Sequence, residues 1–348
     1  MKYLILQHPG HNRVYYSIAD KLALAELKLA STRLSADCTN IDIVEIKNIR
    51  YLSIESDGTL TPKDLNLIAR LSFVFAIFVL KHKDNEDYLI PIQRDEYEYL
   101  NNKISSLLKY PGKTNELFTK MMINVAMLSS DFTYGDKIKM LDPVAGKGTT
   151  LFEGTTYGFD TYGIEIEPKS VHEASIFFRK YLQTERVKHL MSKKQIYGSN
   201  KSDAVEIQKF EYATSKEQFK SRETIKTLGM VNGNSQNAFK YFKKELFNII
   251  VGDLPYGIAH GNVKGKKTAS KTRNPSHLLD ECLPEWVKVL KKGGAIIVAW
   301  NSFIVNRQKL SETFTKHGLE VLSDSPYDEF EHMVDKSIKR DIVVARKR

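Results

Sequence analysis

The spacing of apolar and polar residues predicts that residues 1–110 contain strands and helices in the order β-α-β-β-α-β. This order is typical of a small ferredoxin-like α+β domain. Thr61, Pro62 and Asp64 mark the start of its second helix as a capping residue, a first-turn proline and an acid. The predicted elements are the strands Lys2–Gln7, Ile41–Ile46, Tyr51–Glu55, Phe73–Leu80 and Tyr88–Gln93 and the helices Tyr16–Leu29 and Thr61–Arg70.

Residues 111–348 change to a regular alternation of strands and helices after the amphipathic helix Asn115–Leu128. Five βα units closed by an antiparallel pair predict an α/β fold, an open and mostly parallel sheet with helices on both faces. The predicted parallel strands are Ile138–Asp142, Thr161–Glu165, Met230–Asn232, Phe247–Gly252 and Gly294–Trp300, and the closing pair is Leu319–Leu322 with Arg340–Arg346.

The formal net charge of +10 is concentrated in two segments that look like insertions. Residues 183–228 hold ten basic and six acidic side chains, and residues 258–276 hold five basic and no acidic ones. Residues 1–110 are balanced, with 14 of each sign. Concentrated positive charge indicates a polyanionic partner, although two solvated lysine-rich loops are the alternative. The first insertion is expected to be helical or partly mobile.

The length of 348 residues suggests about two domains, and no apolar stretch approaches the ~18 residues of a membrane span. The apolar run Tyr3–Leu6 is too short for a signal peptide, so we expect a cytoplasmic protein without a membrane partner. Cys38 and Cys282 fit neither a disulfide framework nor a metal-binding spacing, so no metal is expected.

The loop after the first parallel strand has the composition of a cofactor-binding turn. In Asp142-Pro143-Val144-Ala145-Gly146-Lys147-Gly148-Thr149, the two glycines permit a tight turn and a close approach of a ligand to the backbone. The next helix should begin near Thr149, so that free amide groups face the ligand. The segment is not a Walker loop, and Leu151 replaces the third glycine of a dinucleotide fingerprint.

Polar residues also follow the second and third parallel strands. Glu165 lies 23 residues after Asp142, close to the ~20 expected for an acid that binds ribose hydroxyls. There are two alternatives: Glu167 is the weaker candidate for binding the ribose, or Glu165 is only a surface charge at a strand end. Asn234 is a candidate for the adenine amine because its side-chain oxygen can accept a hydrogen bond, with a plain Asn-Gly turn as the alternative.

The loop after the fourth strand, Asp253-Leu254-Pro255-Tyr256-Gly257, suits a flat polar base. An exocyclic amino group is a poor nucleophile because its lone pair is delocalised into the ring. The Asp253 carboxylate and the Leu254 carbonyl can accept its hydrogens, Pro255 stiffens the loop, and Tyr256 offers a face for stacking. Alone, the segment favours a plain Pro-Tyr-Gly turn; paired with the glycine loop, it favours a base-binding site.

The stretches LDPVAGKGTT, GIEIEP and DLPYG resemble motifs of the class I S-adenosylmethionine-dependent methyltransferases, whose Rossmann-like sheet ends in an antiparallel strand. The chain most resembles the tRNA guanosine-N2 methyltransferases and related RNA methylases, and PGKTNELFTKMMINVAML is similar to their preceding helix. The resemblance covers residues 111–348, whereas residues 1–110 are only loosely similar to the RNA-binding front end of such enzymes. Leu254 departs from the stricter motif of DNA adenine methylases.

The resemblance implies S-adenosylmethionine as the cofactor, RNA as the partner, and methylation of a base in structured RNA, foremost guanine N2 in tRNA. Methylation of rRNA at adenine N6 or guanine N7 and of DNA at adenine N6 are alternatives, as are a silent RNA-binding module and a nicotinamide dehydrogenase. The implied cofactor-binding residues are Asp142, Pro143, Ala145, Gly146, Gly148, Thr149, Glu165, Ile166, Asn234 and Asp253, and the implied catalytic residues are Asp253, Leu254, Pro255 and Tyr256.

The second basic segment directly follows the base-binding loop, so its cations are expected to bind RNA phosphates and to close over the site. His260 and His277 flank it as candidate general bases, although surface histidines are more common. Trp300 either lines the pocket or belongs to the core. Residues 1–110 show no catalytic group and are expected to position the substrate or to pack. The expected RNA-binding residues are Lys264, Lys266, Lys267, Lys271 and Arg273.

Overall fold

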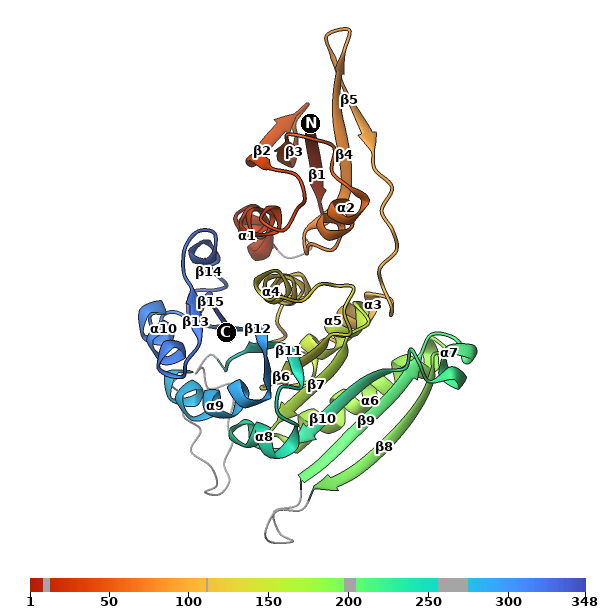
Figure 1. Ribbon diagram of the computed structural model, residues 1–348, viewed down its shortest axis with the longest axis vertical. Helices are drawn as coiled ribbons and strands as arrows, with labels where there is room; N and C mark the ends of the chain where they lie inside the picture. The colour runs from red at the N-terminus through yellow and green to blue at the C-terminus, as the bar shows by residue number, and fades with distance from the viewer. Residues whose placement is uncertain (9–12, 111, 197–204, 256–274) are drawn as a thin grey trace.

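The computed structural model describes residues 1–8, 13–110, 112–196, 205–255 and 275–348. A small sheet lies at the top of Figure 1 and a large sheet lies below it, with helix α4 (Glu116–Ser129) between them. No helix in these ranges is long and apolar enough to cross a membrane.

The small sheet has five antiparallel strands in the order β2-β3-β1-β4-β5. Its first four strands and two helices have the ferredoxin-like arrangement that the sequence predicts. Thr61 and Asp64 form the reciprocal capping box at the start of α2. The elements are β1 (Lys2–Gln7), α1 (Arg13–Ser31), β2 (Cys38–Ile46), β3 (Ile49–Ser56), α2 (Pro62–Ala69), β4 (Val74–Lys83) and β5 (Glu86–Pro91).

The large sheet has ten strands in the order β13-β15-β12-β11-β6-β7-β10-β9-β8, with β14 paired to β15. Its strands are β6 (Lys139–Asp142), β7 (Asp160–Glu165), β8 (Lys188–Ile196), β9 (Val205–Ala213), β10 (Lys226–Asn232), β11 (Phe247–Asp253), β12 (Leu290–Asn301), β13 (Glu320–Leu322), β14 (His332–Met333) and β15 (Lys339–Arg346). The helices around it are α3 (Lys103–Leu107), α5 (Thr149–Thr156), α6 (Pro168–Thr184), α7 (Lys216–Ser221), α8 (Ala238–Tyr241), α9 (Pro275–Val289) and α10 (Arg307–Lys316), with short 3-10 turns at Ser235–Asn237 and Tyr327–Glu329.

The five central strands β12, β11, β6, β7 and β10 are parallel, and β15 runs antiparallel between β12 and β13. Alternate residues of β11 enter different cores: Ile249 and Val251 pack with α4, and Ile250 packs with α9 and α10. The α/β fold with a closing antiparallel pair is confirmed. Because parallel strands point the same way, the loops that follow them meet at one edge, called here the carboxyl edge.

The insertion at residues 183–228 differs from the expected helix. It forms the hairpin β8–β9, which extends the large sheet through antiparallel pairing of β9 with β10, followed by the short helix α7. Phe210 and Tyr212 face α6, whereas Val205 and Ile207 pack toward the opposite core. The strand therefore buries different faces in its two halves, which interrupts the apolar alternation that marks a strand in sequence.

A buried polar cluster joins the small sheet to the large one. Glu26 of α1 accepts hydrogen bonds from the Ser72 hydroxyl and from Asn124 Nδ2 at 2.7 Å. The Asn124 side-chain oxygen in turn accepts from the hydroxyls of Tyr134 and Tyr157 at 2.8 and 2.7 Å. One continuous apolar core also spans both sheets through α4. The domain boundary near residue 110 stays a prediction.

Candidate functional site

Three carboxylates lie at the ends of three neighbouring strands. The sheet order β11-β6-β7 places Asp253, Asp142 and Glu165 side by side along the carboxyl edge. The three carboxylates are close enough that the negative charges of Asp253 and Glu165 both raise the pKa of Asp142. The two predicted loops therefore meet, and the sheet brings Asp142 and Asp253 together although 111 residues separate them in the sequence.

The glycine loop folds tightly against the neighbouring strand. Gly146 and Gly148 have positive φ angles of 52° and 89°, which explains glycine at both positions. Ala145 donates its backbone N–H to the Ile164 carbonyl at 3.0 Å. A side chain at Gly163 would approach the Ala145 methyl to 2.7 Å, so the glycine of the second motif lets the loop sit on β7. Thr149 then opens α5, as predicted.

Glu165 holds the loop and the start of the next helix together. Its carboxylate accepts hydrogen bonds from the backbone N–H of Gly146 at 2.8 Å and of Glu167 at 2.7 Å. Burial raises its pKa, and these backbone donors oppose the rise. Ile166 is exposed beside it, and Glu167 instead caps α6 through the Lys169 N–H. Each Glu165 oxygen keeps acceptor capacity for a hydroxyl group.

Asp142 is the most deeply buried of the three carboxylates. It accepts a hydrogen bond from the Val144 N–H at 3.0 Å, and Pro143 lies against Gly252 at the end of β11. Burial raises the pKa of Asp142 to about 7, and the negative charges of Asp253 and Glu165 add to the rise. A site of this kind favours a ligand that carries positive charge.

A residue that the sequence did not single out orients Asp253. Thr114, just before α4, donates its hydroxyl to the Asp253 carboxylate. The same segment covers the glycine loop, because the Tyr110 hydroxyl lies 2.9 Å from the Thr149 hydroxyl and Lys147 lies over the Tyr110 ring. Only the similarity of this stretch to the helix that precedes the sheet in the resembled family pointed toward it.

The rest of the base-binding loop is partly described. Leu254 is 1% exposed, and its side chain packs in the core with Leu279 and Trp286, while its N–H donates to the Ala299 carbonyl at 2.9 Å. Pro255 is exposed. The predicted residues Tyr256, Lys264, Lys266, Lys267, Lys271 and Arg273, together with His260, lie outside the described residues. Their roles stay predictions.

The third strand ends in a network of amide side chains. Asn234 accepts the Gln236 N–H at 3.0 Å with its side-chain oxygen and donates to the Gln236 side-chain oxygen at 3.1 Å. The adenine contact of Asn234 therefore stays a prediction that competes with this local turn. Asn232, which the sequence did not suggest, donates to the Glu165 carbonyl at 3.1 Å and ties the two strand ends together.

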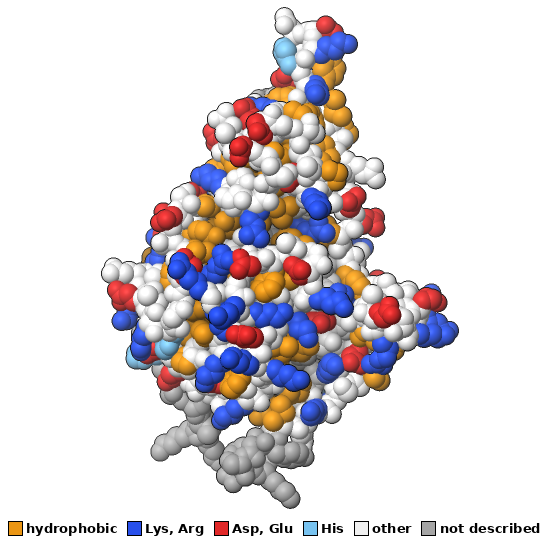
Figure 2. Space-filling view, viewed as in Figure 1, with side chains coloured by type: hydrophobic (Ala, Val, Ile, Leu, Met, Phe, Trp, Pro, Cys, Tyr) orange, Lys and Arg blue, Asp and Glu red, His pale blue; other side chains and the backbone are white. Residues whose placement is uncertain are grey.

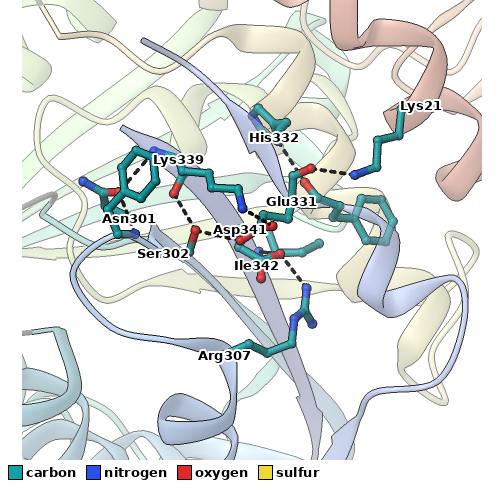
Figure 3. Close-up of polar contacts among 11 residues, drawn as sticks. Lys21, Asn301, Ser302, Arg307, Glu331, His332, Lys339, Asp341 and Ile342 are labelled. Carbon is teal, nitrogen blue, oxygen red and sulfur yellow. Dashed lines mark hydrogen bonds and ion pairs between the residues drawn. The ribbon is translucent and has the colours of Figure 1, made fainter. Parts of the chain in front are cut away.

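A hydrogen-bonded turn follows β12. It lies beside the base-binding loop because Asp253 of β11 is paired with Ala299 of β12. Trp300 belongs to the core and donates to the Val305 carbonyl at 2.8 Å, and the Asn301 oxygen accepts the Phe303 and Lys339 N–H groups. Figure 3 shows Asn301 and Ser302 joined to Lys339, and Glu331 joined to Lys21 of α1. The turn presents Phe303, which is 58% exposed, at the carboxyl edge.

His277 is exposed in the first turn of α9, and its role as a base stays a prediction. In the part of the chain that is described, no cluster of three or more His, Cys, Asp or Glu residues is arranged to hold a metal ion.

Four features together define a class I methyltransferase. They are an open parallel sheet closed by an antiparallel strand, the glycine loop after β6, the acid Glu165 at the end of β7, and the loop Asp253-Leu254-Pro255 at the end of β11. A model of the UPF0020 family, described as the RMKL-like methyltransferase domain, matches residues 119–320. This match covers more than half of the chain, which therefore belongs to that family and is an S-adenosylmethionine-dependent methyltransferase.

Solved structures with a similar fold are distant in sequence. TrmN from Thermus thermophilus is 12% identical, with 77% of this chain and 59% of that chain covered at a TM-score of 0.40. An rRNA methylase from Streptococcus thermophilus is 9% identical (61% and 87% covered, TM-score 0.31), and a SAM-dependent methyltransferase from Leishmania major is 10% identical (62% and 67%, 0.36). A comparison with curated protein sequences gives no match.

The residues at the carboxyl edge suit S-adenosylmethionine. Its sulfonium and amino groups are positive and complement three clustered carboxylates, and its ribose hydroxyls can donate to Glu165. The glycine loop leaves space, because a side chain placed on Gly146 would meet no atom within 4 Å. A nicotinamide dinucleotide, with its negative pyrophosphate, would face repulsion from the same three carboxylates.

We expect the affinity for S-adenosylmethionine to rise about tenfold between pH 5.5 and 7.0. Asp142 has a higher pKa in the folded chain, about 7, than its ordinary 3.8, so the cofactor-free protein loses stability as pH rises through this interval. A bound cation favours the ionised carboxylate, and binding therefore releases a proton. Calorimetric titration across this range measures the effect, and Asp142→Asn should remove it. An unchanged profile in that variant would contradict the assignment.

Proposed function

We propose that this methyltransferase modifies a base in structured RNA, with guanine N2 in tRNA as the first candidate. The observation that carries the proposal is the Asp253 carboxylate, which Thr114 fixes at the carboxyl edge as the last residue of the buried strand β11. The excess of basic residues in the two insertions at 183–228 and 258–276 favours a polyanionic substrate over a small molecule. Methylation of rRNA at adenine N6 or guanine N7 and of DNA at adenine N6 are the competing functions.

In this mechanism, S-adenosylmethionine supplies a methyl group on a positively charged sulfur. Asp253 accepts a hydrogen bond from the exocyclic amino group of the base, which holds the nitrogen lone pair toward the cofactor side and provides an acceptor for the departing proton. Thr114 keeps the carboxylate in one orientation. The exposed Phe303 provides a ring for the face of the flipped base.

The small sheet has a positioning role in this proposal. Lys21 of α1 donates to the Glu331 carbonyl at 2.7 Å, and the Ser302 hydroxyl donates to the Glu331 carboxylate at 2.8 Å. Together with the buried Glu26 and Asn124 pair, these bonds fix the N-terminal residues relative to the turn that carries Phe303. RNA held by the small sheet would therefore approach the site at a fixed angle.

Mass spectrometry of nucleosides tests the function. Total tRNA, rRNA and DNA from a strain that lacks the protein are incubated with the purified enzyme and isotopically labelled S-adenosylmethionine. We expect labelled N2-methylguanosine in tRNA. Label in N6-methyladenosine or N7-methylguanosine of rRNA would assign the alternative chemistry, and label in DNA alone would contradict an RNA substrate.

A further inference from the structure

Lysines crowd the edge of the large sheet that lies opposite the cofactor site. They open or directly precede four parallel strands, β6, β10, β11 and β12, which all begin at this amino edge. Figure 2 shows Lys and Arg side chains gathered over the part of the molecule where Figure 1 draws these strands. We call this group the lysine belt; it comprises Lys137, Lys139, Lys226, Lys243, Lys244, Lys291 and Lys292.

The belt lysines form no direct ion pair with acids in the described ranges, although the charges of Asp136 and Asp160 act on Lys291 and Lys226. No ion pair within the described ranges includes any of its seven lysines, whereas the adjacent Lys288 and Lys347 are paired with Glu285 and Glu245 at 2.6 and 3.3 Å. The nearest belt-facing carboxylates have backbone partners of their own. Asp136 accepts the Thr133 N–H, and Asp160 accepts the Thr227 N–H, both at 2.8 Å.

Two belt lysines are held in place rather than free in solvent. Lys291 donates to the Asn248 side-chain oxygen at 3.3 Å and lies 5.4 Å from the centre of the Phe132 ring. Lys226 lies 5.5 Å from the centre of the Tyr99 ring. Burial lowers the pKa of both lysines. The charge of Lys139 lowers the pKa of Lys291 further and Asp136 opposes it, whereas Asp160 opposes the fall at Lys226 and Lys137 adds to it.

We propose that the lysine belt binds the phosphodiester backbone of the same RNA whose base enters the carboxyl edge. This inference rests on the proposed RNA substrate. β11 has seven residues, so the two edges lie roughly 23 Å apart at about 3.3 Å per residue. Only a polymer can contact both. The structure therefore assigns a polynucleotide long enough to pass around the sheet as the substrate, rather than a nucleotide or a trinucleotide.

The test is a quantitative comparison of charge variants. Lys137, Lys243, Lys244 and Lys292 are exposed, and all four are replaced by glutamine. Binding of full-length tRNA and of a trinucleotide is measured at several salt concentrations. We expect the affinity for tRNA to fall at least tenfold at low salt and the slope of log K against log salt to flatten by about 3. Binding of the trinucleotide and of S-adenosylmethionine should be unchanged.

A matched control removes the same charge elsewhere. Four exposed lysines outside both the small sheet and the belt are replaced by glutamine in one variant: Lys103, Lys309, Lys316 and Lys336. An equal loss of tRNA affinity in the control would overturn the proposal. No loss of tRNA affinity in the belt variant would also overturn it and would point to an acidic protein as the partner of the belt. Failure of the proposed function is distinguishable, because the unaltered enzyme would then neither bind nor label RNA.

Discussion

Replacing Asp253 by alanine is expected to lower the rate of methyl transfer by about 10²–10³-fold, the usual effect of removing one oriented hydrogen-bonding group from an active site. The variant should bind S-adenosylmethionine nearly as well as the unaltered enzyme, because Asp142 and Glu165 still supply negative charge to the pocket. Single-turnover transfer of labelled methyl groups to total tRNA measures the first effect, and calorimetric titration with S-adenosylmethionine measures the second.

Variants of Thr114 test whether the orientation of the Asp253 carboxylate matters in addition to its charge. Thr114→Val removes the hydroxyl that donates to Asp253 and should lower turnover, whereas Thr114→Ser keeps the hydroxyl and should restore most of it. Asp324→Asn, an exposed acid in the connection after β13, is the matched control and should have no effect. Unchanged transfer by Asp253→Ala would contradict the catalytic role of this loop, whereas absence of transfer in the unaltered protein as well would identify a silent RNA-binding protein.

The sequence predicted the carboxyl edge well because the parallel strands are buried on both faces. Such strands have an apolar centre, as in Ile249–Val251 of β11, and the apolar run ends abruptly where the chain reaches solvent and polar residues begin. Asp142, Glu165 and Asp253 all stand at these transitions. Their position relative to the strands therefore followed from local pattern, and the sheet order then placed them on neighbouring strands.

Thr114 and the lysine belt escaped detection for a different physical reason. Thr114 lies 139 residues from Asp253 and outside any strand, so no spacing rule connects the two. Except for Lys226, which lies in the basic insertion, the belt lysines come from residues 111–182, 229–257 and 277–348, whose summed charges are −1, +1 and +1. Folding separates charge by edge of the sheet, and a sum along the chain cannot show that.

The fold of the insertion was missed because its pattern changes phase. In β9, the first half packs on the core that contains α9 and the second half packs on the core that contains α6, with the buried Gln208 between them. The apolar residues of β9 therefore show no steady alternation along the sequence. The polar partner strand β8 has little apolar surface and depends on pairing with β9 for its place. Pairing between distant backbone groups leaves weak traces in local sequence.

Replacing Glu165 by alanine is expected to raise the dissociation constant of S-adenosylmethionine by about 10- to 100-fold. A hydrogen bond to a charged group contributes about 1.5–3 kcal/mol, and ribose binding would be lost with the carboxylate. Glu167→Gln is the control, because Glu167 is exposed and only caps α6 through the Lys169 N–H. An equal loss in both variants would favour Glu167 as the ribose ligand.

A cofactor analogue that lacks one ribose hydroxyl distinguishes ribose binding from a purely structural role. Glu165 also accepts the Gly146 N–H, so its removal loosens the glycine loop as well. If Glu165 binds the ribose, the missing hydroxyl should weaken binding to the unaltered enzyme and make little difference to Glu165→Ala. If Glu165 only holds the loop, the analogue should lose the same affinity in both proteins. Calorimetric titration of the four combinations gives this coupling directly.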